Sequence, residues 1–379
     1  MKLMHLSDLH LGKRVYEFSM IEDQHHILDQ ILEIADKERP DAVLIAGDVY
    51  DKSQPSIEAV ELLDWFLVQL AERKLPVFII SGNHDSAERL AFGNRLMEGT
   101  GIHIASVFQG ISEPISLTDQ FGEVRLYLLP FVKPVQVKKA FPDASAESYT
   151  DAVKTCIDAM KVDPSVRNVL VTHQFVTGAS RSESEEISVG GTDNVDASVF
   201  DAFDYVALGH IHGPQNIGSE RIRYCGTPLK YSFSEASHTK SITLAELGPK
   251  GELTVSTIPF EPLRDLKEIK GTYSQLTLKS FYEEGDLQKD YLHITLTDED
   301  DVVDAAAKLR IIYPNLMTMD YDNSRTRHQA CLEDLLPMEN KSELELFEEF
   351  FKGSTGADLN DKQMDYLAQI IEEIKEQRV

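Results

Sequence analysis

Five short blocks of this chain share one arrangement, in which an apolar run is followed at once by histidine, aspartate or asparagine. The blocks are LMHLSDLHLG, AVLIAGDVYD, VFIISGNHD, NVLVTHQF and YVALGHIHG. Apolar runs of this length, bounded by glycine and polar residues, are typical of buried strands. In open α/β sheets, reactive groups collect outside the carboxyl ends of the strands. The five blocks therefore predict one polar site built from distant parts of the chain.

The polar residues of these blocks are of the kinds that bind divalent cations, and mixed nitrogen and oxygen ligands suit Mn, Fe or Zn. Seven of them are candidate metal ligands: Asp8, His10, Asp48, Asn83, His173, His210 and His212. A single block is explained equally well by a cap or a turn. Five blocks in this order predict a metal site. Histidines outside the blocks are expected to be ordinary: His5, His25, His26, His103, His238, His293 and His328.

Apolar runs alternate with amphipathic stretches over the first 245 or so residues, which predicts a layered α/β domain. The expected strands are Lys2–Leu6, Ala42–Ala46, Val77–Ile80, Val124–Leu129, Asn168–Thr172, Tyr205–Leu208, Arg221–Tyr224 and Ser241–Leu247. The expected helices are Ile21–Lys37, Ser56–Arg73 and Ala146–Lys161. Pro262 and the charged stretch Leu263–Lys270 are expected to form a connector.

Beyond the connector, the pattern predicts a small α/β domain with the strand Tyr291–Leu296, the helix Val302–Ile312 and the strand Leu316–Asp320. In the tail, apolar spacings of three and four predict two helices, Ser342–Lys352 and Asp361–Glu376. Their apolar stripes either pack on their own domain or dock on the helices of a partner. The expected domains are residues 1–262, 263–330 and 331–379.

The formal net charge of −27 lowers the expectation of a nucleic-acid ligand, because nucleic-acid binders usually carry a basic surface. Part of this charge is local, since residues 331–379 hold 13 acidic and 5 basic side chains, a net of −8. A metal centre and a few basic residues would still bind phosphate. The basic candidates near the blocks are Lys13, Arg14, Arg89, Arg181 and Lys230.

No apolar run approaches the roughly 18 residues of a membrane helix. Because Met1 leads directly into a strand-like run, no signal peptide is expected. The three cysteines Cys156, Cys225 and Cys331 form no CxxC pair, so the sequence supports neither a disulfide framework nor a zinc ribbon. We therefore expect a cytoplasmic protein that does not bind a membrane.

The order D-x-H, G-D-x-x-D, G-N-H-D, H and G-H-x-H resembles the calcineurin-like metallophosphoesterase superfamily. More closely, SDLHLGK, IAGDVYDKSQPS, SGNHDSAERL, GHIHGPQ and CGTPLKYSFSEA resemble the SbcD family, the nuclease subunits of bacterial SbcC–SbcD DNA repair complexes. The likeness extends to PLRDLKEIKGT and the small domain after it. It implies a layered β-sandwich core flanked by helices, with a small α/β cap domain and C-terminal helices.

The resemblance also implies two divalent ions that share Asp48. One would be held by Asp8, His10, Asp48 and His212, and the other by Asp48, Asn83, His173 and His210. It implies Mn²⁺, exonuclease and endonuclease action on double-stranded DNA ends and hairpins, and a homodimer. Ser56–Arg73 is a possible dimer helix, although packing on the sheet explains its apolar stripe equally well. The chain lacks the GxxxxGKS or GxxxxGKT motif, so any ATP dependence must come from a partner. The resemblance implies an SMC-like SbcC-type ATPase, with coiled-coil segments that the C-terminal helices could bind.

Three further residues are candidates for catalytic roles. We expect His84, beside Asn83, to contact the phosphate and to protonate the leaving oxygen. Asp85 either orients His84 or caps a helix. Archaeal and eukaryotic relatives carry a second catalytic histidine at the position of Asp51, so here His84 is left to carry the acid chemistry.

Two other functions stay open at this point. One is a small-molecule phosphomonoesterase or cyclic-nucleotide phosphodiesterase with the same metal core. The other is a non-catalytic scaffold that presents its tail to a partner. The GTPLKYSFSEA block and the 110-odd residues after the core argue against the first, and the complete set of ligands argues against the second.

Overall fold

The structure is a computed structural model that describes residues 1–110, 113–185, 193–283 and 285–326, and residues 347, 348, 351, 352, 359, 360, 363, 364, 367 and 370. The chain divides into two units, Met1–Leu266 and Lys267–Val379. This division lies close to the expected boundary after residue 262. The expected boundary after residue 330 falls outside the described residues and stays a prediction.

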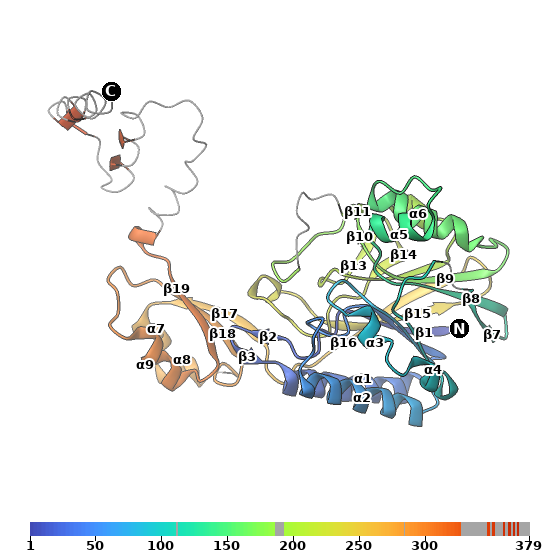
Figure 1. The fold of residues 1–379 in the computed structure, drawn as a ribbon. Coiled ribbons are helices and arrows are strands. Elements are labelled where there is room, and N and C mark those ends of the chain that lie inside the picture. Colours follow the sequence, from blue (N-terminus) through green and yellow to red (C-terminus); the bar gives the residue numbers. More distant parts are fainter. Residues whose placement is uncertain are drawn as a thin grey trace. The chain divides into compact units, whose positions relative to one another are not determined.

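The first unit contains two six-stranded sheets (Figure 1). The first sheet has the order β16 (Leu253–Pro259), β15 (Ser241–Leu247), β1 (Lys2–Leu6), β4 (Ala42–Ala46), β5 (Val77–Ile80) and β6 (Ile102–Ala105). The second has the order β13 (Gln215–Ile217), β14 (Ser219–Tyr224), β12 (Tyr205–Gly209), β9 (Arg167–His173), β8 (Gly122–Leu129) and β7 (Ile115–Asp119). Two pairs of short strands accompany them: β2 (Arg14–Val15) with β3 (Phe18–Ser19), and β10 (Phe175–Val176) with β11 (Asn194–Val195).

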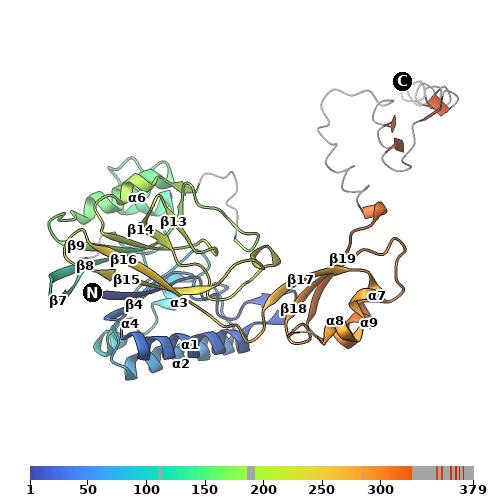
Figure 2. The ribbon, with the colours of Figure 1, turned by 180° about the vertical axis from the view of Figure 1, so that it is seen from behind.

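Helices flank the two sheets on the outside. Figures 1 and 2 show α1 (Ile21–Glu38) and α2 (Ile57–Glu72) side by side on one flank, and α5 (Pro134–Ala140) and α6 (Tyr149–Met160) on the other. The short helical segments of this unit are α3 (Ala87–Leu90), α4 (Asn94–Met97) and the 3-10 turns Glu98–Thr100, Ala197–Phe200 and Phe233–Glu235.

Side chains of the second sheet alternate between two apolar cores. In β9, Val169 and Val171 pack between the two sheets, whereas Leu170 packs with Val153 and Cys156 of α6. Successive residues of a strand point to opposite faces, so a strand covered on both faces reads as a continuous apolar run. The expected layered β-sandwich flanked by helices is therefore confirmed.

The direction of the strands brings the polar blocks together. β1, β4 and β5 are parallel neighbours in the first sheet, and β9 and β12 are parallel neighbours in the second. Parallel strands end at the same edge of their sheet. The blocks that follow these strands carry Asp8, Asp48, Asn83, His173 and His210.

All eight strands expected for the core are present, although several elements escaped the sequence pattern. These include β6, β7, β13, β16 and α5, the two-residue strands β2, β3, β10 and β11, and the short helices α3 and α4. Helix α6 begins at Tyr149 instead of Ala146, because Ser148 and Asp151 form a capping box at its start. None of the described helices combines the length and apolar character that crossing a bilayer requires.

The second unit contains a three-stranded sheet, β17 (Leu266–Gly271), β18 (Tyr291–Leu296) and β19 (Leu316–Tyr321). Its described helices are α7 (Tyr273–Leu276), α8 (Lys279–Tyr282) and α9 (Ala305–Ile312). The expected connector Leu263–Lys270 is wrong from Leu266 onward. β17 lies at the edge of the sheet, and after the buried Leu266 its positions alternate between half-buried and exposed. Its charged residues therefore give it the composition of a linker. The two expected tail helices lie largely outside the described residues.

Candidate metal centre

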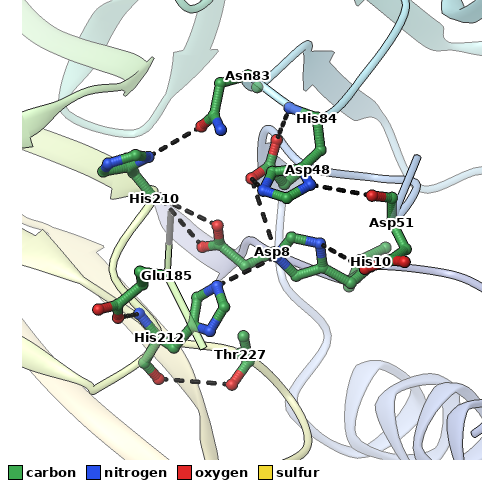
Figure 3. Close-up of polar contacts among 12 residues, drawn as sticks. Asp8, His10, Asp48, Asp51, Asn83, His84, Glu185, His210, His212 and Thr227 are labelled. Atoms are coloured by element: carbon green, nitrogen blue, oxygen red, sulfur yellow. Dashed lines mark hydrogen bonds and ion pairs between the residues drawn. The ribbon is translucent and has the colours of Figure 1, made fainter. Parts of the chain in front are cut away.

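The structure brings the seven candidate ligands into one site, part of which Figure 3 shows. Six of the seven residues are buried and Asn83 is half-buried. Asp8, His10, Asp48 and His210 have positive φ angles, which are uncommon in residues other than glycine. Such conformations cost about 1–3 kcal/mol each and persist where the surrounding structure enforces them, often at functional sites.

One cluster of ligand atoms surrounds the amide of Asn83. Its Oδ1 lies 3.0 Å from His173 Nε2 and 2.9 Å from His210 Nδ1. Asp48 Oδ2 lies 3.3 Å from the same nitrogen of His173. Four side chains from both sheets therefore converge on one point.

A second cluster adjoins the first. His10 Nε2 and His212 Nε2 lie 3.1 Å apart, and Asp8 offers an oxygen within 4.8 Å of ligand atoms of both. Asp48 Oδ2 is 3.8 Å from His10 Nε2, so this carboxylate reaches both clusters. The backbone amide of His210 also donates to Asp8 Oδ1 at 3.0 Å, which ties the two sheets together.

The donor set fits a divalent cation. His173 Nδ1 lies 2.8 Å from the carbonyl oxygen of Ala46, which only accepts hydrogen bonds, so Nδ1 carries the hydrogen. A neutral His173 then presents a lone pair at Nε2, facing Asn83 Oδ1 and the Asp48 carboxylate, which are also lone-pair donors. Three such atoms at these distances need positive charge among them, either a proton on Nε2 or a metal ion.

The pKa values of the buried groups agree with a cation site. Burial lowers the pKa of His210 to about 3, which keeps its imidazole neutral, as a metal ligand must be. Burial also lowers the pKa of His173, but the charge of Asp48 outweighs it and raises this pKa to about 9 without a metal. Burial raises the pKa of Asp8 to about 6. The Asp48 carboxylate therefore favours positive charge at His173, whereas burial disfavours charge on His210 and Asp8.

Two glycines allow the clusters to form. A Cβ at Gly82 would lie 2.0 Å from Asp48 Oδ1, and a Cβ at Gly209 would lie 1.9 Å from the carbonyl oxygen of Ala46. Real Cβ atoms do not approach other atoms so closely. Glycine at both positions therefore lets the two sheets bring Asp48 and His173 together.

The half-buried His84 lies beside the centre, with its Nε2 4.0 Å from Asp48 Oδ2. Its Nδ1 lies 2.9 Å from the backbone oxygen of Asp51 and therefore carries a hydrogen. The Asp51 side chain accepts from Lys13 Nζ at 2.8 Å and lies 3.8 Å from His10 Nδ1. Asp51 thus orients His84 through its backbone, while its carboxylate is paired with a lysine.

Asp85 has a role that the sequence did not predict. Its carboxylate accepts hydrogen bonds from the backbone amides of Val49 at 3.1 Å, Tyr50 at 2.9 Å and Gly82 at 2.9 Å. It therefore braces the turns that carry Asp48 and Asn83. Neither the expected orientation of His84 nor the expected helix cap corresponds to these contacts.

Two histidines outside the blocks make ordinary structural contacts. His5 contacts the Tyr205 hydroxyl at 2.9 Å and the Leu208 oxygen at 3.2 Å, and burial lowers its pKa to about 3. His25 stacks on Trp65. His328 lies outside the described residues.

Three of the five basic candidates are paired within the protein. Lys13 binds Asp51, Arg181 binds Asp193 at 2.9 Å, and Lys230 binds Asp265 at 2.8 Å. Arg14 and Arg89 are exposed. Pairing with a carboxylate makes the first three weaker candidates for a phosphate contact.

Two grooves meet at Asn83. One, of about 810 Å³, is lined by Arg14, Lys52, Ser53 and His84 among others. The other, of about 650 Å³, is lined by Ser53, Phe108, Phe131, Lys133 and Lys139 among others. Each groove thus offers two basic side chains, and the two are joined at the metal centre.

The sequence did not reveal a group of polar residues behind His212. These are Ser184, Glu185, Glu235 and Lys240, and Figure 3 shows the hydrogen bond between Glu185 and the His212 backbone. Ser184 and Glu185 lie in the acidic stretch SRSESEEIS, which no periodicity distinguishes from a solvent-exposed loop. Glu235 lies within the GTPLKYSFSEA block, which was recognised only by its resemblance.

Comparison with known proteins agrees with this donor set. The family described as calcineurin-like phosphoesterase matches residues 1–214, and the family described as type 5 capsule protein repressor C-terminal domain matches residues 262–355. The SbcD protein of the SbcCD nuclease of Staphylococcus epidermidis is 33% identical over 378 residues, which cover 98% of each chain.

Two solved structures show weaker likeness. A dimetal phosphatase from Danio rerio covers 68% of this chain and 95% of its own, at 13% identity and a TM-score of 0.42. A protein of Thermus thermophilus covers 68% and 98%, at 12% identity and a TM-score of 0.38. Neither score is high enough to support an argument about function.

Proposed function

The chain belongs to the calcineurin-like phosphoesterases and, among them, to the SbcD nuclease subunits, and from this premise we propose that it is a two-metal nuclease that hydrolyses DNA phosphodiesters with an SbcC-type ATPase partner. The proposal includes both exonuclease and endonuclease action in DNA repair and recombination. The observation that carries it is the convergence of lone-pair donors from both sheets on Asp48.

The two clusters support a division of the ligands between two ions. Asp8, His10 and His212 would hold one ion, and Asn83, His173 and His210 the other, with Asp48 bridging them. The mixed nitrogen and oxygen donors suit Mn²⁺, which we propose as the metal, although the donors suit Fe and Zn as well.

When bound, the two ions would polarise the phosphodiester and lower the pKa of water at the site. In the reaction, a water oxygen forms a bond to phosphorus and loses a proton to solvent, while the bond from phosphorus to the leaving oxygen breaks. His84 would supply a proton to that leaving oxygen. Because Nδ1 of His84 donates to the Asp51 carbonyl oxygen, Nε2, which lies 4.0 Å from Asp48 Oδ2, is the nitrogen left to deliver the proton.

The two grooves support a polymeric substrate. They join at Asn83, so a strand that lies along both would place one phosphate at the metal centre. Arg14 and Lys52 in one groove, and Lys133 and Lys139 in the other, would contact phosphates on either side of the cleaved bond. The partly buried rings of Phe108 and Phe131 would contact an unpaired base. The acidity of the whole chain does not oppose these local contacts.

The alternative of a small-molecule phosphatase or cyclic-nucleotide phosphodiesterase is not favoured. The likeness to the SbcD protein of Staphylococcus epidermidis covers 98% of the chain, and a second family matches residues 262–355, beyond the core. A non-catalytic scaffold is also disfavoured, because it would not need seven intact ligands at one buried point.

A direct assay tests the proposal. Purified protein with Mn²⁺ is given labelled duplex DNA, p-nitrophenyl phosphate or bis-p-nitrophenyl phosphate in parallel. We expect cleavage of DNA and of the diester, and little of the monoester. Hydrolysis of the monoester alone would indicate a phosphatase, and inactivity on all three substrates would indicate a scaffold.

Partner binding is part of the proposal but rests on the sequence of the tail. We propose that the C-terminal helices bind coiled-coil segments of an SbcC-type ATPase. Deletion of residues 339–379 should abolish co-purification of the ATPase and preserve metal-dependent cleavage. Retained co-purification would show that the ATPase binds elsewhere.

A homodimer through α2 is also proposed. Ile57, Val60 and Val68 expose apolar side chains on this helix, and Ile57 is 76% exposed. A Val60→Glu, Val68→Glu variant should elute as a monomer in size-exclusion chromatography, and elution of the wild type as a monomer would exclude the dimer.

We place the reaction in the cytoplasm, since the described cysteines Cys156 and Cys225 are free.

A further inference from the structure

His212 is fixed at its backbone and at its ring by side chains that the sequence did not connect with it. Its backbone amide donates to Glu185 Oε1 at 2.6 Å. Its carbonyl oxygen accepts from Lys240 Nζ at 2.8 Å and from the backbone amide of Thr227 at 3.1 Å. Its ring nitrogen Nδ1 lies 2.5 Å from Ser184 Oγ.

The hydrogen bonds of Ser184 determine the tautomer of His212. Ser184 Oγ lies 2.5 Å from Glu235 Oε1, and an ionised carboxylate only accepts hydrogen bonds. The single hydroxyl hydrogen of Ser184 therefore goes to Glu235. Ser184 must then accept from His212, so Nδ1 of His212 carries the hydrogen and Nε2 presents its lone pair toward His10.

A buried ion pair keeps Glu235 ionised. Lys240 Nζ donates to Glu235 Oε2 at 2.5 Å, to Thr227 Oγ1 at 2.7 Å and to the His212 carbonyl oxygen, which uses all three of its hydrogens. Glu235 is completely buried and Lys240 is 6% exposed. An ammonium group that donates to this carboxylate at 2.5 Å favours its ionised form.

The other histidine ligands are oriented differently. Nδ1 of His173 is held by a backbone oxygen, and Nδ1 of His210 faces Asn83, a candidate ligand. Nδ1 of His10 is buried without a hydrogen-bond partner among the described residues. Within the described part of the site, His212 is therefore the histidine ligand whose ring contacts a serine hydroxyl that is held by an ion pair.

We propose that Ser184, Glu235 and Lys240 are positioning residues for the metal ion that His10 and His212 hold. This inference rests on the proposed two-metal function and assigns a purpose to the GTPLKYSFSEA block, which supplies Thr227 and Glu235. Partners that orient a metal-bound histidine usually change metal affinity or activity about 10- to 100-fold when removed. The effect should fall on one of the two ions, since the three residues act on His212, which belongs to the cluster of His10 and not to that of Asn83.

Mn²⁺ binding to the metal-free full-length chain tests the proposal through substitutions at Ser184. Ser184→Ala should weaken one of two Mn²⁺ equivalents about 10- to 100-fold in equilibrium dialysis and leave the other unchanged. At limiting Mn²⁺, the electron paramagnetic resonance spectrum of the wild type should be that of a coupled pair of ions. The spectrum of Ser184→Ala should be that of a single ion. Ser184→Thr keeps the hydroxyl and should restore both. Ser232→Ala makes the same change at a serine whose side chain contacts Ser234 instead, so it should bind as the wild type does.

A double variant separates positioning from structural support. Glu235→Gln with Lys240→Met removes both charges, so neither partner is left buried and unpaired. If the pair positions His212, this variant should melt near the wild-type temperature and still lose one Mn²⁺ equivalent. Binding of two equivalents at wild-type affinity, by this variant or by Ser184→Ala, would overturn the inference. A wild-type protein that binds no Mn²⁺ would instead refute the proposed function.

Discussion

The Nε2 atoms of His10 and His212 lie 3.1 Å apart, although 202 residues separate the two histidines along the chain. His212 presents a lone pair here, because its Nδ1 donates to Ser184. Burial holds the pKa of His10 well below its usual range, so its ring is neutral, as a metal ligand must be. A divalent cation is the species that this arrangement accepts at neutral pH.

Addition of Mn²⁺ to metal-free protein should therefore stabilise the fold. A ligand at 100 times its dissociation constant stabilises the native state by about 2.7 kcal/mol. The melting temperature should rise with Mn²⁺ concentration in differential scanning fluorimetry and return on chelation with EDTA. His173→Ala should reduce this rise, whereas the paired surface residue His25 can be changed to Ala as a control. An equal rise in the His173 variant would argue against the Asn83 cluster as a metal site.

His84→Gln should retain both metals and lose most of its turnover. Glutamine can still hydrogen-bond to the Asp51 carbonyl oxygen but has no proton to transfer at the position of Nε2. General acid catalysis contributes about 10²–10⁴-fold, so kcat on bis-p-nitrophenyl phosphate should fall within that range. The metal content of the same sample is measured by mass spectrometry. Full activity, or loss of metal, would remove His84 from the role of acid.

Gly82→Ala should disrupt the metal centre without any change in the ligands themselves. The added Cβ would meet Asp48 Oδ1 at 2.0 Å, so the bridging carboxylate must move. Misplacement by about 1 Å can cost about 10²-fold in rate. Gly99→Ala adds the same atom where nothing lies within 4 Å, and it should cleave DNA at the wild-type rate. Equal activity in both variants would show that Asp48 tolerates displacement.

The sequence predicted the ligands well because each ligand lies at or just after the end of one of five strands. A strand and the residue after it form a local pattern, and parallel pairing then brings Asp8, Asp48 and Asn83 to one edge. The contacts of Ser184 and Asp85 have no such pattern. They depend on where loops from separate parts of the chain pass each other, which neither periodicity nor spacing encodes.

The errors in the fold have a related cause. β17 was expected to be a connector, because an edge strand with one exposed face carries charges like those of a linker. The positive φ angles of Asp8, His10 and Asp48 were also invisible in the sequence, since residue type favours other conformations there. Tertiary contacts decide both features.

Asp119→Asn should destabilise the protein at neutral pH and have little effect in acid. Two hydrogen bonds from the buried Arg167 hold the pKa of Asp119 well below its usual range. A lowered folded pKa contributes stability above the unfolded value of about 3.9, and this stability is lost as the pH falls below it. Hydrogen bonds to charged groups contribute about 1.5–3 kcal/mol. Urea midpoints of the two proteins should differ at pH 7, and the difference should shrink steadily as the pH falls below about 3.9, whereas a constant difference would contradict the assignment.

Substitution of the groove lysines should weaken the binding of DNA and leave the hydrolysis of a small diester unchanged. Lys133 and Lys139 line the groove that ends at Asn83, and Lys138 lies between them on α5 without lining it. Lys133→Gln with Lys139→Gln should raise the KM for DNA and leave hydrolysis of bis-p-nitrophenyl phosphate unchanged, because that substrate does not reach the groove. If each lysine contacts one phosphate of a single strand, the slope of log affinity against log salt should become less steep by about 1.4.

Lys138→Gln removes one charge from the same helix and should leave the KM unchanged. An equal effect per charge removed in the two variants would indicate that only the net charge at α5 matters, and that the strand does not follow this groove.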